Sequence, residues 1–179
     1  MKRLLMFGLA LAGLFLQGSP VHGQSVLKEK MAPSILNYLV TAAPEYSIMV
    51  RAINTARLEN TFTSSGPITV FAPSNKAFDV LPAGTLDNWL KPEMIDSLQK
   101  ILTYHVIAGT WTTSELKRKI RETGGEFFMP TLGEGGKLSF MLENNMVVVK
   151  DTKGFKTVLG VPSQQPNGLV YGLDKLLLP

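Results

Sequence analysis

The segment Ile68-Thr69-Val70-Phe71-Ala72-Pro73-Ser74-Asn75-Lys76-Ala77-Phe78 decides the fold of this chain. The apolar, β-branched and aromatic residues before Pro73 predict a short strand over 68–72. Pro73 has no amide hydrogen to donate to a neighbouring strand, so we expect the strand to stop there. Ser74 is a favoured N-cap residue, and its hydroxyl should accept a hydrogen bond from the next turn. The segment therefore predicts a strand that leads directly into a helix.

Two later segments have the same mixed character. The stretch Ile101-Leu102-Thr103-Tyr104-His105-Val106-Ile107 carries the end of a predicted helix into a strand over 104–107. Near the C-terminus, Asn167-Gly168 is a turn signal that precedes a strand predicted over 169–173. The sequence therefore places three short apolar strands at distant positions in one chain.

The other predicted elements separate into early helices and late strands. Helices are predicted at 35–40, from Pro44 to about 53, from Pro92 to about 103, and from a Thr112–Glu115 capping box to about 122. Residues 82–91 are predicted to be irregular. Strands are predicted at 127–129, 138–142 and 146–150, with a tight turn at Asn144-Asn145. This order predicts the α+β class, because an alternating parallel fold would intersperse its strands and helices.

The N-terminal segment has the pattern of a secretory signal peptide. Lys2 and Arg3 precede an apolar run over 4–16, and small residues near Gly23 offer a cleavage site. The run is shorter than the roughly 20 apolar residues that a membrane-spanning helix needs. We therefore expect a signal peptide at 1–23, a short leader at 24–32 and a single domain at 33–179. The mature protein is expected to be secreted or periplasmic, with no transmembrane segment.

Charge and cysteine content exclude several classes of function. The formal net charge of the whole chain is +4, and it falls to +2 without Lys2 and Arg3. Such a small positive charge gives only weak support for nucleic-acid or membrane binding, and we expect no nucleic-acid partner. The chain has no cysteine, which excludes disulfides and thiolate metal sites. A mature chain of about 156 residues is long enough to fold around one core without such crosslinks.

The three segments together resemble the motifs of the fasciclin domain family, over roughly residues 33–179. The resemblance rests on Thr69, Phe71, Ala72, Pro73, Ala77, Phe78, Tyr104, His105, Asn167, Gly168 and Asp174. The chain departs from the family pattern at Tyr171-Gly172, where the family usually has a histidine and an apolar residue. The resemblance implies a wedge of two β-sheets flanked by several α-helices. It also implies an extracellular adhesion module that is not an enzyme and that uses no cofactor.

His105 is the one histidine that remains after the expected cleavage. Its imidazole could contact a ligand or transfer a proton. The interpretation that we favour is a partly buried ring whose nitrogens bond backbone groups at a helix–strand junction. Tyr104 should alternate with it along the strand and could present its phenol outward. The family's Tyr-His segment is associated with receptor adhesion, so the resemblance implies that Tyr104 and His105 contact a partner.

Other catalytic and metal-binding patterns are incomplete. Ser97-x-x-Lys100 and Ser114-x-x-Lys117 lack the companion motifs of acyl-serine enzymes. Gly133–Lys137 has the wrong spacing for a phosphate loop, and a hairpin loop is predicted there. The carboxylates occur singly, and Asp174 is expected to act as a local cap or to pair near Lys175. The sequence therefore predicts no catalytic, metal-binding or cofactor-binding residue.

One basic run occurs on the helix predicted after Thr112. Its cations are Lys117, Arg118, Lys119 and Arg121. Leu116 and Ile120 are one turn apart and should be buried, so the cations surround a solvated face on which Glu115 and Lys119 can pair. The alternative is that Lys117, Arg118 and Arg121 bind an acidic polysaccharide or an anionic surface, in which case salt would weaken binding.

Three functions follow in order of support. The leading hypothesis is a secreted, non-catalytic module for cell adhesion or for interaction with an extracellular or envelope protein. The alternative is a module that binds an envelope glycan or polysaccharide. An enzyme has the least support, because a metal-dependent hydrolase would need clustered histidine and carboxylate ligands.

Overall fold

The computed structural model describes residues 33–42, 44–64 and 66–179. The predicted signal peptide at 1–23 and the leader at 24–32 lie outside the described residues. The described residues belong to one compact unit.

The first sheet, sheet A, unites the three segments that the sequence singled out. Its strand order is β2-β1-β8-β7. The bounds are β1 (Ile68–Pro73), β2 (Val106–Ala108), β7 (Ser163–Gln165) and β8 (Gly168–Leu173). The long pairing of β1 with β8 is parallel, whereas β2 and β7 pair antiparallel at the two sides. Every residue of β1 is buried, as expected for a central strand.

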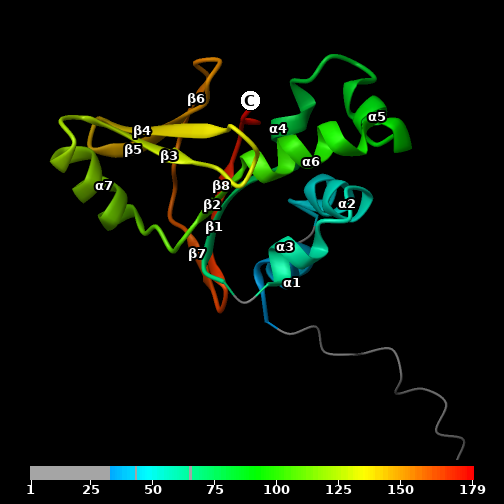
Figure 1. The fold of residues 1–179 in the computed structure, drawn as a ribbon, viewed down its shortest axis with the longest axis horizontal. Helices are drawn as coiled ribbons and strands as arrows, with labels where there is room; N and C mark the ends of the chain where they lie inside the picture. Colours follow the sequence, from blue (N-terminus) through cyan, green and yellow to red (C-terminus); the bar gives the residue numbers. More distant parts are fainter. Residues whose placement is uncertain (1–32, 43, 65) are drawn as a thin grey trace, which may run out of the picture. The chain divides into compact units, whose positions relative to one another are not determined.

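The second sheet, sheet B, is an antiparallel meander of four consecutive strands (Figure 1). Its strands are β3 (Glu126–Pro130), β4 (Lys137–Glu143), β5 (Met146–Lys150) and β6 (Lys156–Val158). Asn144 and Asn145 connect β4 to β5 with φ values of 51° and 62°, which confirms the tight turn predicted from the sequence. The short strands β6 and β7 were not predicted.

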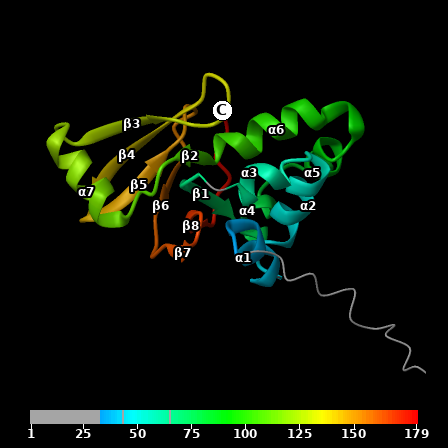
Figure 2. The same ribbon diagram turned by 60° about the horizontal axis from the view of Figure 1, so that its bottom comes forward.

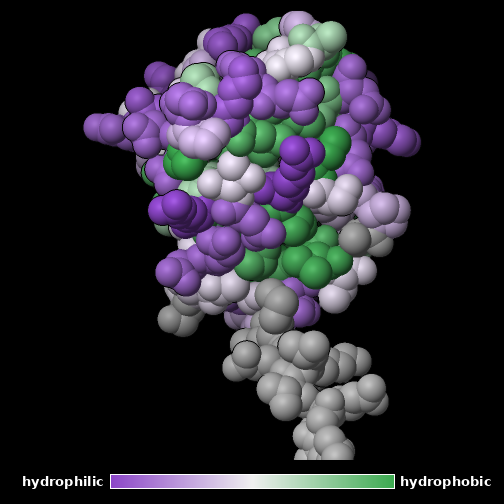
Figure 3. Space-filling view, turned by 90° about the vertical axis from the view of Figure 1, so that its right-hand side faces the viewer, coloured by the Kyte–Doolittle hydropathy of each residue, from purple (hydrophilic) through white to green (hydrophobic). Residues whose placement is uncertain are grey.

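Most helices lie beside sheet A, and α7 lies beside sheet B (Figures 1 and 2). They are α1 (Ile35–Thr41), α2 (Ser47–Thr55), α3 (Glu59–Thr63), α4 (Asn75–Asp79), α5 (Thr85–Trp89), a 3-10 turn η1 (Pro92–Met94), α6 (Ile95–Tyr104) and α7 (Thr113–Glu122). On the side that carries many of these helices, hydrophobic surface is divided by hydrophilic side chains (Figure 3). The predicted α+β class, with two sheets and flanking helices, is confirmed.

Two clusters of apolar side chains form the core. One lies between the helices and sheet A, and it includes Leu39, Met49 and Val70. The other joins both sheets to α7. In this second cluster the Phe71 ring lies 5.6 Å from Phe140 and 5.7 Å from Tyr171, measured between ring centroids. Such aromatic pairs add roughly 0.5–1.5 kcal/mol each to the stabilisation from burial.

Several local predictions differ from the structure. The helix predicted from Pro44 begins at Ser47, and the strand predicted over 104–107 is β2 (Val106–Ala108). Pro73 remains in β1, because the neighbouring Ser74 amide supplies the hydrogen bond to Leu173 O at 2.8 Å. The Ser74 side chain does not cap α4, and the Ala77 amide bonds to the Ser74 carbonyl oxygen instead, at 2.9 Å. Residues 85–89, predicted to be irregular, form α5.

Candidate functional site

His105 lies at the C-terminal cap of α6 and has no exposed surface. Its Nδ1 lies 2.7 Å from the carbonyl oxygen of Ile101, and the Leu177 amide donates to Nε2 at 3.0 Å. The ring is therefore neutral, with Nδ1 donating and Nε2 accepting. Burial lowers the pKa of His105 to about 4, although the Ile101 hydrogen bond and Asp151 act in the opposite direction. The structure confirms the backbone-bonded ring that we favoured, and neither nitrogen is left to bind a ligand.

Tyr104 is the last residue of α6, not the first residue of a strand. Its side chain is 1% exposed. The hydroxyl donates to the Lys137 carbonyl oxygen at 2.9 Å and accepts from the Thr152 amide at 3.1 Å. The expectation that the phenol faces outward is therefore wrong, because Tyr104 belongs to α6 and its hydroxyl bonds to backbone groups of Lys137 and Thr152 in the core. Neither Tyr104 nor His105 offers a side chain to a partner.

Asn167 connects the start of the domain to β8. Its Oδ1 accepts from the Ile35 amide at 2.8 Å, and its Nδ2 donates to the carbonyl oxygens of Phe62 and Ser64 at 3.0 and 3.2 Å. The next residue, Gly168, has φ of 146°, and a Cβ atom there would lie 1.7 Å from the carbonyl oxygen of Ile68. The Asn-Gly pair is thus required by packing.

The remaining motif residues have structural roles, apart from Asp174. Thr69 is fully buried, and its hydroxyl donates to Gly109 O at 2.7 Å while accepting from the Trp111 amide at 2.9 Å. The apolar motif side chains are also buried: Phe71, Ala72, Pro73, Ala77 and Phe78. Asp174 is exposed. Among the described residues it forms no salt bridge, so the expected pairing near Lys175 is not observed.

The basic helix α7 is capped and partly neutralised by its own carboxylates. Thr112 and Glu115 form the predicted capping box, in which the Thr112 amide donates to Glu115 Oε2 at 2.9 Å. The expected Glu115–Lys119 pair is not formed, because Glu115 is occupied by the cap. Arg118 and Lys119 instead pair with Glu122 at 2.8 and 3.0 Å. The hydrogen bond from Lys119 has the larger effect and that from Arg118 the smaller, and both lower the pKa of Glu122.

Lys117 and Arg121 have different surroundings. Arg121 Nη2 lies 3.4 Å from Asn145 Oδ1. Lys117 forms no salt bridge within the described part of the chain, and it lines a groove of ≈ 450 Å³. We call this the α7 groove and define it by Lys117, Met146, Val161 and Pro162. The sequence analysis missed this groove, although the apolar residues Val161 and Pro162 between two turn-forming segments could have indicated an exposed apolar loop.

The described residues contain no cluster of metal-ligating side chains. No group of three or more histidine, cysteine, aspartate or glutamate side chains there could hold a metal ion. The buried carboxylate of Asp151 is used by backbone amides: Oδ1 accepts from Lys153 and Phe155, and Oδ2 accepts from Leu178. Within residues 33–179, apart from 43 and 65, no helix has the length and apolar character required to cross a bilayer.

The geometry defines a two-sheet α+β domain in which most of the polar motif residues stabilise the fold. The chain belongs to the Fasciclin domain family, whose profile matches residues 44–179. It is 32% identical over 158 residues to Protein sll1483 of Synechocystis sp., covering 87% of this chain and 80% of that protein.

Two further similarities come from animals. Over 136 residues the chain is 33% identical to Transforming growth factor-beta-induced protein ig-h3 of Oryctolagus cuniculus, covering 75% of this chain and 18% of that protein. A solved FAS1 domain pair from the insect cell adhesion molecule Fasciclin I matches with a TM-score of 0.68 and 18% identity, over 83% of this chain and 51% of that one. At this identity the second match supports the fold alone.

Proposed function

We propose that this chain is a secreted, non-catalytic module that holds an extracellular or envelope protein on its surface. The proposal is supported by membership of a family that includes a protein named as a cell adhesion molecule. It is also supported by the use of His105, Tyr104 and Asn167 inside the fold, which leaves recognition to the exterior. Secretion is inferred from the signal-peptide pattern at 1–23. If the signal peptide is cleaved as expected, mass spectrometry of the exported protein should find Gln24 as its first residue.

The α7 groove is the observation that carries the protein-binding proposal. Val161 is 95% exposed and Met146 is 47% exposed, and both line the groove beside Lys117. Exposed apolar side chains next to Lys117, which forms no salt bridge in the part of the chain that the structure describes, suit a partner that offers an apolar anchor flanked by a carboxylate. A few such anchors supply most of the affinity in protein interfaces.

The test is titration of labelled protein onto intact cells of the organism that produces it. Saturable binding is expected, and Val161→Asp should weaken it by about tenfold or more, because a charge replaces an apolar contact. Val80→Asp is the matched control, since Val80 is 76% exposed and does not line the groove. Equal binding by Val161→Asp and the unmodified protein would exclude the groove, and the absence of saturable binding would contradict the adhesion function.

The second candidate function is binding of an acidic envelope polysaccharide. A polysaccharide site on α7 is less well supported, because Arg118 and Lys119 already pair with Glu122. A different surface, the face of sheet B away from α7, favours the function more strongly. Retention on immobilised polygalacturonate that decreases as salt rises would support it, and passage without retention at low salt would contradict it.

A further inference from the structure

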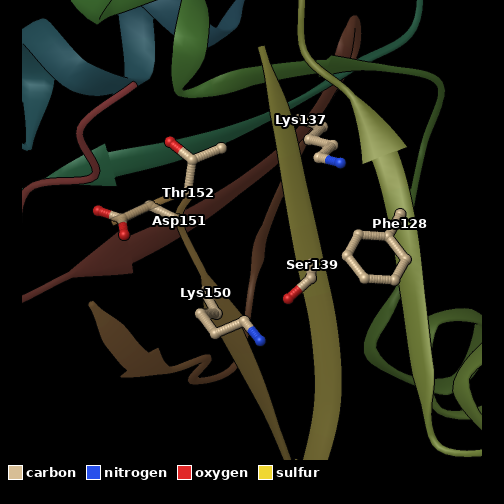
Figure 4. Close-up of a pocket in the computed structure, with 6 residues that line it drawn as sticks. All are labelled: Phe128, Lys137, Ser139, Lys150, Asp151 and Thr152. Carbon is tan, nitrogen blue, oxygen red and sulfur yellow. The ribbon is translucent and has the colours of Figure 1, made fainter. Parts of the chain in front are cut away.

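A row of three side chains crosses the face of sheet B that is turned away from α7. Phe128 on β3 lies opposite Ser139 on β4, and Ser139 lies opposite Lys150 on β5. Directly opposed residues point to the same face of a sheet, so these side chains are neighbours. Figure 4 shows the Ser139 hydroxyl and the Lys150 amino group turned toward each other, with the Phe128 ring beside Ser139. With Lys137 on the same face, they form what we call the sheet B site.

The Ser139 hydroxyl is buried but is not hydrogen-bonded. Ser139 is 4% exposed, and its Oγ has no partner within the described residues. The Glu126 carboxyl is close enough that Lys150 first, and a contact with the Ser139 hydroxyl second, lower its pKa, but the Ser139 contact does not have the geometry of a well-formed hydrogen bond. Buried hydroxyl groups nearly always have a partner. Because the Ser139 hydroxyl makes no well-formed hydrogen bond among the described residues, it can bond to a ligand that enters the hollow.

Two lysines flank this hydroxyl. Lys150 Nζ lies 2.8 Å from Glu126 Oε1, so part of its charge is balanced. Lys137 Nζ lies 5.6 Å from the centroid of the Phe128 ring and forms no salt bridge among the described residues. An ammonium group held by an aromatic face keeps its charge available to an anion. The site thus offers a cation without first breaking an ion pair.

These side chains line a hollow of ≈ 330 Å³, with Asp151 and Thr152 at its edge. The Asp151 carboxylate accepts three backbone amides and points away from Ser139 in Figure 4. The backbone amides therefore stabilise this charge, and the carboxylate oxygens are directed away from the Ser139 side of the hollow. The Phe128 ring is 53% exposed and supplies an apolar wall. A volume of this order lies at the lower end of small-ligand sites.

The combination of groups restricts the ligand. An inorganic anion would use the lysines but not the ring of Phe128, and an apolar side chain would use the ring but not Ser139. A sugar carboxylate uses all of them, because polarised C–H groups can pack on an aromatic face while hydroxyl and carboxylate oxygens bond to Ser139 and Lys137. We propose that the sheet B site binds a uronic acid residue of an acidic polysaccharide.

This inference rests on the second proposed function and names its ligand class and its site. The probe is tetragalacturonate, titrated into the mature protein at about 0.05 M salt, where exposed charges are weakly screened. The fully methyl-esterified tetramer is the uncharged comparison. Calorimetry should detect the acidic tetramer and show at least about tenfold weaker binding of the ester, because the ester cannot form the charge-assisted bond to Lys137.

Two substitutions and one matched control locate the site. Lys137→Gln should raise Kd by about tenfold and Phe128→Ala by about fivefold. Lys117→Gln removes the same charge from α7 and should change Kd by less than about twofold, because α7 packs on the opposite face of sheet B and Lys117 does not line the hollow. Circular dichroism of each variant verifies that the fold is unchanged.

The outcomes separate the site from the function. Retention of the unmodified protein on polygalacturonate, together with equal effects of Lys137→Gln and Lys117→Gln, would overturn the sheet B site and leave the glycan function standing. Equal binding of the ester and the acid would overturn the uronate specificity. Absence of both retention and calorimetric binding would reject the glycan function and the site together.

Discussion

His105 should make the stability of this domain depend on pH near neutrality. In the folded protein the neutral ring is held by Ile101 O and the Leu177 amide. A proton added to Nε2 would face the Leu177 N–H, which is a donor, and would place a charge in the core. Protonation therefore favours the unfolded chain, where the ring is solvated. The informative perturbation is a decrease in pH combined with His105→Gln, which removes the titrating group.

The magnitude follows from the two pKa values of His105. Its pKa is about 4 when folded, below the ordinary value of 6.5. Because the folded value is the lower one, the stabilisation is present above pH 6.5 and is lost as the pH falls from 6.5 toward 4. The free energy of unfolding should decrease by about 1.4 kcal/mol at pH 5.5 and by about 3 kcal/mol near pH 4.

The assay is urea unfolding followed by circular dichroism at pH 7.5 and pH 5.5. At pH 5.5 the carboxylates whose pKa values are lowered, Glu115, Glu122 and Glu126, remain ionised, because their ordinary value is 4.5. His105→Gln should be less stable than the unmodified protein by about 1–3 kcal/mol at pH 7.5, through lost hydrogen bonds and packing. Between the two pH values the variant should lose about 1.4 kcal/mol less than the unmodified protein.

The comparison of the two proteins isolates His105, because every other titrating group, including His22, is common to both. Equal losses of free energy in the unmodified protein and in His105→Gln would refute the reasoning. Such a result would mean that the buried ring is protonated as readily in the folded protein as in the unfolded chain.

Two further predictions concern the packing of the other motif residues. Gly168→Ala should lower the free energy of unfolding by more than about 3 kcal/mol, because the added Cβ would overlap the carbonyl oxygen of Ile68 in the pairing of β1 with β8. If urea titration shows a loss below about 1 kcal/mol, the sheet adjusts to the added methyl group and the reasoning is wrong. Tyr104→Phe should lower the free energy of unfolding by about 1–3 kcal/mol, since the Lys137 carbonyl and the Thr152 amide each lose their hydrogen bond to the Tyr104 hydroxyl. An unchanged melting temperature would show that these two hydrogen bonds do not stabilise the fold.

The features predicted correctly from the sequence depend on neighbouring residues. The capping box of Thr112 and Glu115 closes within one helical turn, and the Asn144-Asn145 turn requires only that two adjacent residues adopt positive φ. The spacing of Leu116 and Ile120 likewise identified the buried face of α7. The predicted roles of Ser74 and Tyr104 were wrong because distant backbone groups, not local propensity, determine their surroundings.

The strands β6 and β7 also depend on distant parts of the chain. Each has three residues and no regular apolar alternation, and each forms by pairing with an edge that a longer strand, β5 or β8, presents. Such edges exist only after the sheets have assembled, so no local pattern could have indicated these strands.

The sequence by itself determined the family and the α+β class, because these depend on short motifs and on the order of helices and strands. The tertiary structure alone decided which residues are available for binding. It placed both nitrogens of His105 in hydrogen bonds and aligned Phe128, Ser139 and Lys150 through the register of three strands. The physical reason is that burial and cross-strand neighbours arise from contacts between residues far apart in the chain, which local spacing does not encode.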